Sequence, residues 1–111
     1  MTNLIVQFNL FKMTIINKIL WITTFEKIGN KSDFSNYLIC ARVALKKFNV
    51  KIKFISTGSI KLEGKKFQRI VCLEFKKISD AKKFFKSKEY TKARGYLKKG
   101  KSIRHLNLIN N

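Results

Sequence analysis

The chain has 111 residues, 45% hydrophobic and 28% charged, which suits one globular domain. We expect neither a membrane span nor a secretory signal, because apolar runs stay below roughly 20 residues and no small-residue cleavage site follows a basic start. Cys40 and Cys72 form no CxxC pair, so we expect buried thiols in a cytoplasmic protein. Residues 18–111 are expected to form the domain, after an N-terminal extension over residues 1–17 in which Met13 offers an alternative start.

Two elements are predicted in the first half of the domain. Ile19–Phe25 is rich in β-branched and aromatic residues, which predicts a strand. After a turn, Ser32 or Asp33 is expected to cap a helix that runs to about Phe48. The helix carries one apolar stripe, which indicates a buried face: Phe34, Tyr37, Leu38, Ala41, Leu45 and Phe48.

The middle of the chain predicts two strands and a short helix. Val50–Ile55 alternates apolar residues with lysines, which is typical of a half-buried strand. Phe67–Phe75 is substantially apolar on both faces, so we expect a central strand covered on both sides. Ser79 or Asp80 is expected to cap the short helix, and a kink or restart is predicted at Ser87.

The C-terminal part completes an alternating pattern. Glu89–Lys98 predicts a helix that stops at Gly100, and Ile103–Ile109 predicts the last strand. The order β-α-β-β-α-β indicates a ferredoxin-like α+β fold, with an antiparallel four-stranded sheet and helices on one face. The other sheet face carries Ile70 and Cys72, and such an apolar face needs a cover.

The net charge of +19 leaves an alternative function open. A basic domain is typical of nucleic-acid binding, but here 21 lysines stand against 4 arginines, and lysine reads few base edges. Lys, Ile, Phe and Asn make up 54 of the 111 residues, so A/T-rich codon usage also explains the charge. The base-stacking positions of an RNA-recognition motif would hold Ile70 and Cys72, and only Trp21 offers a ring. A lysine-rich nucleic-acid- or ribosome-associated protein remains the alternative.

One composite motif resembles a known family. It joins an arginine, a Leu-Glu-Phe strand end and a Ser-x-Glu-Tyr helix start. The pattern is similar to the signature of the family called domain of unknown function 1330, over Ile19 to Ile109. Lys88 stands where that family has proline. The matching residues are Arg69, Leu73, Glu74, Phe75, Ser79, Ala81, Phe85, Ser87, Glu89 and Tyr90.

The resemblance implies a dimeric α+β barrel. Two sheets of a homodimer would then pack face to face and bury Ile70 and Cys72. It also implies a pocket between sheet and helices that works without a cofactor, for a small-molecule ligand and a reaction that is not assigned. We expect no metal, because His105 is the one histidine of the chain.

Five residues are candidates for such a site. Glu74 shares a strand face with apolar residues, so it is either a general acid or base with a raised pKa or a carboxylate paired with a lysine. Arg69, on the opposite face, binds an anion or pairs with an acid at the rim. Trp21 lies in a pocket wall or in the core. Ser87 and Tyr90 complete the ligand-binding candidates, with packing as the alternative for Tyr90.

Overall fold

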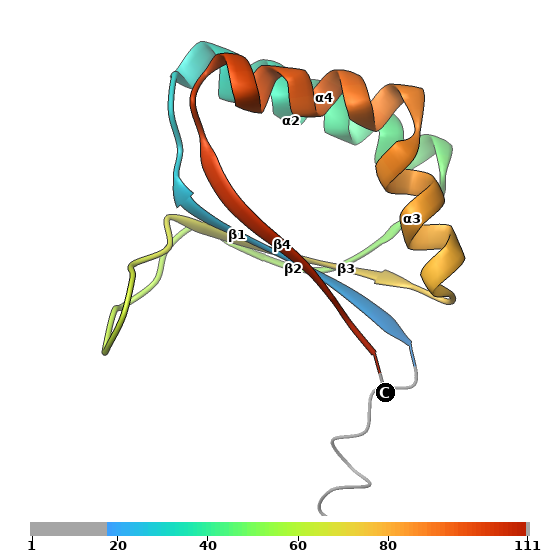
Figure 1. The fold of residues 1–111 in the computed structure, drawn as a ribbon, viewed down its shortest axis with the longest axis horizontal. Helices are drawn as coiled ribbons and strands as arrows, with labels where there is room; N and C mark the ends of the chain where they lie inside the picture. Colours follow the sequence, from blue (N-terminus) through green and yellow to red (C-terminus); the bar gives the residue numbers. More distant parts are fainter. Residues whose placement is uncertain (1–17, 111) are drawn as a thin grey trace, which may run out of the picture.

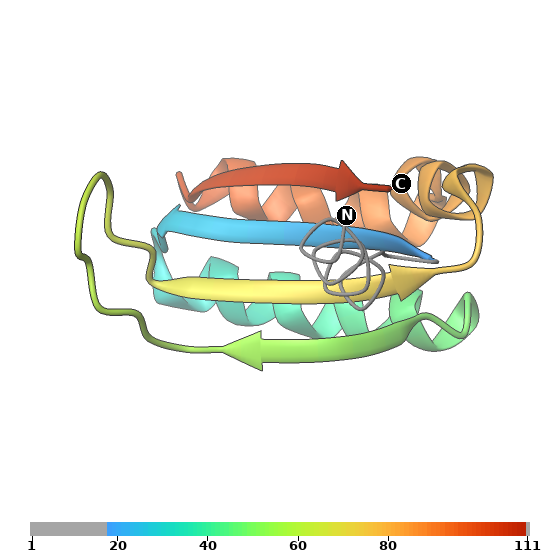
Figure 2. The same cartoon turned by 90° about the horizontal axis from the view of Figure 1, so that it is seen from below.

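The computed structural model describes residues 18–110, and the extension expected over residues 1–17 lies outside the described residues. Four strands form one antiparallel sheet in the spatial order β2-β3-β1-β4, and the helices cover one of its faces (Figure 1, Figure 2). The predicted ferredoxin-like α+β fold is confirmed, with the second helical segment divided in two. The elements are β1 (Ile19–Lys27), α2 (Lys31–Lys47), β2 (Lys51–Ser56), β3 (Arg69–Phe75), α3 (Ile78–Lys86), α4 (Lys88–Lys99) and β4 (Ile103–Ile109).

Strand register decides which side chains face the helices. Alternate residues of β1 are buried under the helices, namely Ile19, Trp21, Thr23 and Phe25. The residues between them face the open side, where Ile22 lies opposite Cys72 and Thr24 lies opposite Ile70. Cys72 is 1% exposed, because its short side chain lies in a row between two larger neighbours. The structure therefore places Ile70 and Cys72 on the open face, as the sequence predicted.

Strand β2 departs from the expected alternation. It forms the edge of the sheet, and a bulge between Ile52 and Phe54 shifts its register against β3. All its residues before Ser56 are exposed, because no strand pairs with its outer edge. The half-buried strand expected over residues 50–55 is therefore an exposed edge strand.

Two predicted helix caps are wrong by two or three residues. Helix α2 is capped by Asn30, whose Oδ1 accepts a hydrogen bond from the Asp33 backbone nitrogen at 3.0 Å. Helix α3 begins at Ile78 without a side-chain cap, so Ser79 and Asp80 lie inside its first turn. A carboxylate there still favours the helix, because it faces the positive end of the helix dipole.

Two loops meet tightly at one end of the molecule. The Asn30 backbone nitrogen donates to the Gly100 carbonyl at 2.9 Å, and the Gly29 nitrogen donates to Ser102 Oγ at 3.0 Å. A Cβ atom on Gly29 would lie 1.8 Å from the Gly100 oxygen. Only glycine therefore allows the loop before α2 to approach the loop before β4 this closely.

Candidate functional site

Two arginines flank one buried phenylalanine on the helix-covered face. Arg69 of β3 and Arg104 of β4 each lie opposite Phe25 of β1, so their Cα atoms are about 10 Å apart across three strands. The Arg69 Cζ lies 5.8 Å from the centre of the Phe34 ring, and the Arg104 Cζ lies 5.8 Å from the Tyr37 ring. The two guanidinium groups thus converge on the aromatic side of α2.

A pair of tyrosines, Tyr37 and Tyr90, lies beside Arg104. Arg104 Nη1 donates a hydrogen bond to the hydroxyl of Tyr90 at 2.6 Å. Burial, and then the neighbouring phenol of Tyr90, raise the pKa of Tyr37 far above its ordinary value, although the charges of Arg104 and Arg69 act in the opposite direction. Tyr37 therefore stays protonated at neutral pH and offers a hydrogen-bond donor.

Arg69 has no acidic partner in the described part of the chain. Within residues 18–110 it takes part in no ion pair and no side-chain hydrogen bond, and its Nε is buried without a partner. The acids that do form ion pairs in this range pair with lysines or with His105. The expected pairing of Arg69 with an acid at the rim is therefore not found within residues 18–110.

A cavity of about 120 Å³ lies between α2 and the strands β2 and β3; we call it the α2 cavity. Its polar lining residues are Tyr37, Arg42 and Arg69, and its other walls are aliphatic. Arg42 is exposed, which places it at the mouth, whereas Arg69 is half-buried. The aliphatic walls include Leu38, Leu45, Ile52, Val71 and Leu73.

Trp21 lies in the core and also lines a cavity, and its ligand-binding role stays a prediction. It is 2% exposed and lies in an aromatic cluster, with ring centres 5.3 Å from Phe84 and 5.5 Å from Tyr90. It also lines a second cavity of about 190 Å³ between α3 and β4, which we call the α3 cavity. The other residues of that cavity are Ala81, Lys82, Phe85, Lys86, Leu106 and Leu108. The structure therefore separates Trp21 from Arg69.

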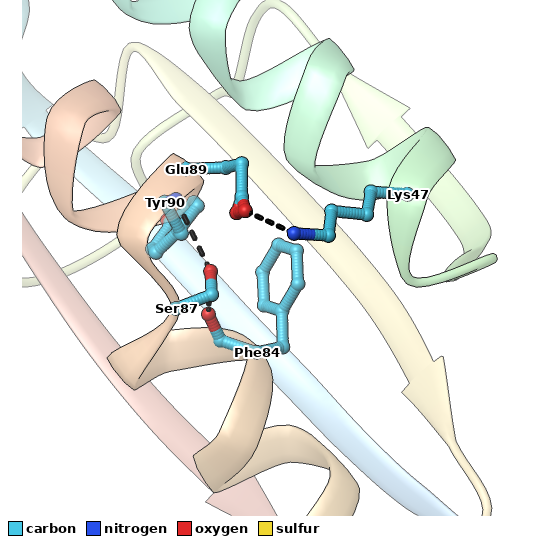
Figure 3. Close-up of polar contacts among 5 residues, drawn as sticks. All are labelled: Lys47, Phe84, Ser87, Glu89 and Tyr90. Carbon is cyan, nitrogen blue, oxygen red and sulfur yellow. Dashed lines mark hydrogen bonds and ion pairs between the residues drawn. The ribbon is translucent and has the colours of Figure 1, made fainter.

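Ser87 and Glu89 hold the helices together (Figure 3). Ser87 Oγ donates to the Phe84 carbonyl at 2.7 Å and accepts from the Tyr90 nitrogen at 3.2 Å, which ends α3 and caps α4. Glu89 pairs with Lys47 of α2 at 2.5 Å, and this contact holds the pKa of Glu89 below its ordinary value. Ser87 lines neither the α2 cavity nor the α3 cavity. Its ligand-binding role stays a prediction, as does that of Tyr90.

Glu74 lies on the opposite face of the sheet from Arg69. Its Oε2 is 3.3 Å from Lys51 Nζ and 3.5 Å from Lys18 Nζ, and its side chain is 10% exposed. Burial alone would raise the pKa of Glu74, but the ammonium groups of Lys51 and Lys18 outweigh burial and hold the pKa below its ordinary value. The geometry agrees with the lysine-paired alternative and not with a raised pKa. A catalytic role for Glu74 stays a prediction.

The contacts of Ser87 and Glu89 join the helices, which gives a physical reason for the Ser-x-Glu-Tyr part of the motif. The comparison with protein families supports the resemblance that this motif indicated. A family model described as Domain of unknown function (DUF1330) matches residues 18–111. The chain belongs to this family. Lys88, where the family pattern has proline, begins α4, so this DUF1330 member keeps the helix restart without the proline.

Solved structures share the fold at low identity. The protein of unknown function RPA0582 from Rhodopseudomonas palustris is 9% identical with a TM-score of 0.66, over 94% of this chain and 90% of that one. A dimeric protein of unknown function and ferredoxin-like fold from Bacteroides fragilis is 16% identical with a TM-score of 0.57, over 87% and 99%. SnoaB, a cofactor-independent oxygenase from Streptomyces nogalater, is 6% identical with a TM-score of 0.61, over 86% and 94%. No curated protein matches the chain.

Three features of this DUF1330 member escaped the sequence interpretation. Arg104 was not a candidate, although it lies two residues before the helix-facing Leu106 and therefore shares its face of β4. The apolar stripe of α2 predicts only a core position for Tyr37. His105 Nε2 lies 3.2 Å from Glu26 Oε2 on the open face, beside the bulge of β1, and neither periodicity nor motif predicts that contact.

None of the helices within residues 18–110 is both long and apolar enough to cross a bilayer.

Proposed function

We propose that this chain is a homodimeric small-molecule-binding protein, of the kind that works without a cofactor, whose ligand lies in the α2 cavity. One observation carries the proposal: Arg42, Arg69 and Tyr37 converge on a largely aliphatic cavity beneath a helix. A few polar groups in an apolar concave site are typical of ligand pockets. SnoaB, which shares the fold, is described as a cofactor-independent oxygenase, and this is consistent with a pocket protein that needs no bound group.

The dimer follows from the open face of the sheet. Phe54, Ile103 and Ile109 are 49%, 46% and 42% exposed, and register places them on the same face as Ile70 and Cys72. Exposed apolar side chains gathered on one sheet face are costly to leave in water. We infer that a second copy covers it with its own sheet. The ferredoxin-like protein from Bacteroides fragilis, which is described as dimeric, supports this arrangement.

The dimer is tested by placing a charge on that face. Ile70→Lys should convert a dimer to a monomer at micromolar concentration, measured by size-exclusion chromatography with light scattering. Ile39→Lys is the matched control, because Ile39 is 59% exposed on the outer side of α2 and its change should leave the mass unchanged. A wild-type protein that elutes as a folded monomer would contradict the dimer.

The ligand site is tested by thermal unfolding with a panel of small acids, amides and aromatic compounds. A ligand at about 100 times its Kd stabilises by about 2.7 kcal/mol, which raises the Tm of a domain of this size by about 10 °C. Val71→Phe fills the α2 cavity and should abolish the shift while the protein stays folded. A panel without effect would refute the pocket. Nucleic acid that copurifies and dissociates steeply with salt would instead support the lysine-rich alternative.

A further inference from the structure

We infer that the ligand of the α2 cavity is a short-chain organic carboxylate, whose charged end binds Arg69 and whose carbon chain packs on the aliphatic walls. The inference rests on the proposed function and specifies its ligand class. Its starting point is Arg69, a half-buried cation for which residues 18–110 supply no carboxylate. Its Nε is buried without a hydrogen-bond partner within these residues, and a buried polar group left without a partner is costly.

Aromatic stacking alone does not satisfy such an arginine, as Arg94 shows. Arg94 lies 4.1 Å over the Phe85 ring, and its Nε, like that of Arg69, is buried without a partner. Its Nη2, however, donates to the Phe85 carbonyl at 3.4 Å and to Thr91 Oγ1 at 3.3 Å. It therefore has neutral partners that join α3 to α4. Arg69 has the looser stacking distance of 5.8 Å over Phe34 and no such acceptor within residues 18–110. An acceptor for Arg69 has to come from elsewhere.

The lining of the α2 cavity selects an anion. Arg42 and Arg69 are cations, and Tyr37 is a phenol that stays protonated. No aspartate or glutamate lines the cavity. The two arginines can thus donate hydrogen bonds to a carboxylate, and an arginine fork matches the two oxygens of that group.

The rest of the cavity favours an apolar tail and indicates the size that fits inside it. The walls opposite the arginines are aliphatic, which disfavours a fully hydrated ion such as inorganic phosphate. The volume of about 120 Å³ is smaller than the cavity of about 150 Å³ known to hold benzene. A carboxylate of about three to five carbons therefore fits.

A comparison of butyrate with its neutral isostere butyramide separates two claims: that the α2 cavity binds a small molecule, and that this molecule is a carboxylate. At neutral pH and matched ionic strength, butyrate should raise the Tm and give saturation-transfer NMR signals from its methyl group, whereas butyramide and phosphate should do neither. Stabilisation by butyramide but not by butyrate would leave the pocket standing and overturn the carboxylate. No effect of either compound would overturn the carboxylate, and the pocket itself falls only if the whole panel of acids, amides and aromatic compounds has no effect. Equal binding of phosphate would overturn the selection for an organic acid.

Variants of Arg69 connect binding to this side chain. Arg69→Met should weaken butyrate binding at least about tenfold, the loss expected for one charge-assisted hydrogen bond. The unliganded Tm should change little, because within residues 18–110 Arg69 forms no ion pair or side-chain hydrogen bond and loses only its loose contact with the Phe34 ring at 5.8 Å. Arg69→Lys should restore part of the binding, and Arg94→Met should leave it unchanged. Butyrate bound equally by Arg69→Met and by wild type would refute the assignment.

Discussion

The close approach of two loops at Gly29 makes a sharp prediction about stability. In Gly29→Ala, the new Cβ would lie 1.8 Å from the Gly100 oxygen and 2.8 Å from the Gly100 carbonyl carbon. Non-bonded carbon contacts are relaxed at about 3.5 Å, and backbone atoms cannot rotate away as a side chain can. The two loops must therefore separate by more than about 1 Å. The φ of Gly29 is outside the left-handed region, so the clash alone opposes alanine.

That separation has a calculable cost. It breaks the hydrogen bonds from the Asn30 nitrogen to the Gly100 carbonyl and from the Gly29 nitrogen to Ser102, each worth about 0.5 to 1.5 kcal/mol. Overpacking adds about 1 to 3 kcal/mol. Gly29→Ala should therefore lose about 2 to 6 kcal/mol of the free energy of unfolding, or at least about 8 °C in Tm.

Gly95→Ala provides a control of the opposite sign. Gly95 is exposed on α4, and its Cβ would meet no atom within 4 Å. Alanine in a helix is favoured over glycine by about 0.5 to 1 kcal/mol, so this variant should be more stable than wild type. Urea denaturation followed by circular dichroism measures both changes. A Gly29→Ala protein within about 1 kcal/mol of wild type would show that the loops do not touch.

Two further predictions concern the restart between α3 and α4. Lys88→Pro should stabilise the protein by about 0.4 to 1 kcal/mol in thermal unfolding, because Lys88 is the first residue of α4, where proline is favoured. Ser87 already has the extended backbone that a following proline requires, with φ of −61° and ψ of 152°. A lower Tm would mean that Lys88 does not lie in a first helical turn. The pKa of Glu89 is lowered by Lys47, so its stabilisation is present above the unfolded pKa of about 4.3 and is lost as pH falls below that value. Lys47→Met should therefore make stability less dependent on pH below about 4.5. An unchanged pH profile would refute the pairing.

The sequence predicted those parts of the fold that depend on local periodicity. The last strand, Ile103–Ile109, and the helix stop at Gly100 have the expected bounds. Helix caps were missed, because several polar residues of similar capping strength follow one another before α2, and only the folded backbone decides that Asn30 is used. The edge position of β2 depends on the spatial order of strands, which periodicity does not contain.

The candidate site was less predictable than the fold, because it depends on register between strands far apart in the sequence. Alternation correctly placed Arg69 and Glu74 on opposite faces of β3. It gave no means of finding that Arg104 lies in the same row as Arg69, with Phe25 between them. The lysine partners of Glu74 come from the start of β2 and from the residue before β1, so its low pKa also required the assembled sheet.

The position of Trp21 gives the molecule a built-in optical probe. It is the one tryptophan of the chain, its indole nitrogen donates to Thr23 Oγ1 at 2.8 Å, and its ring is 2% exposed. Emission from the native protein should therefore be that of an indole shielded from water, with a red shift on unfolding. Because the ring lines the α3 cavity and not the α2 cavity, quenching would distinguish a compound bound under α3 from one bound beside Arg69.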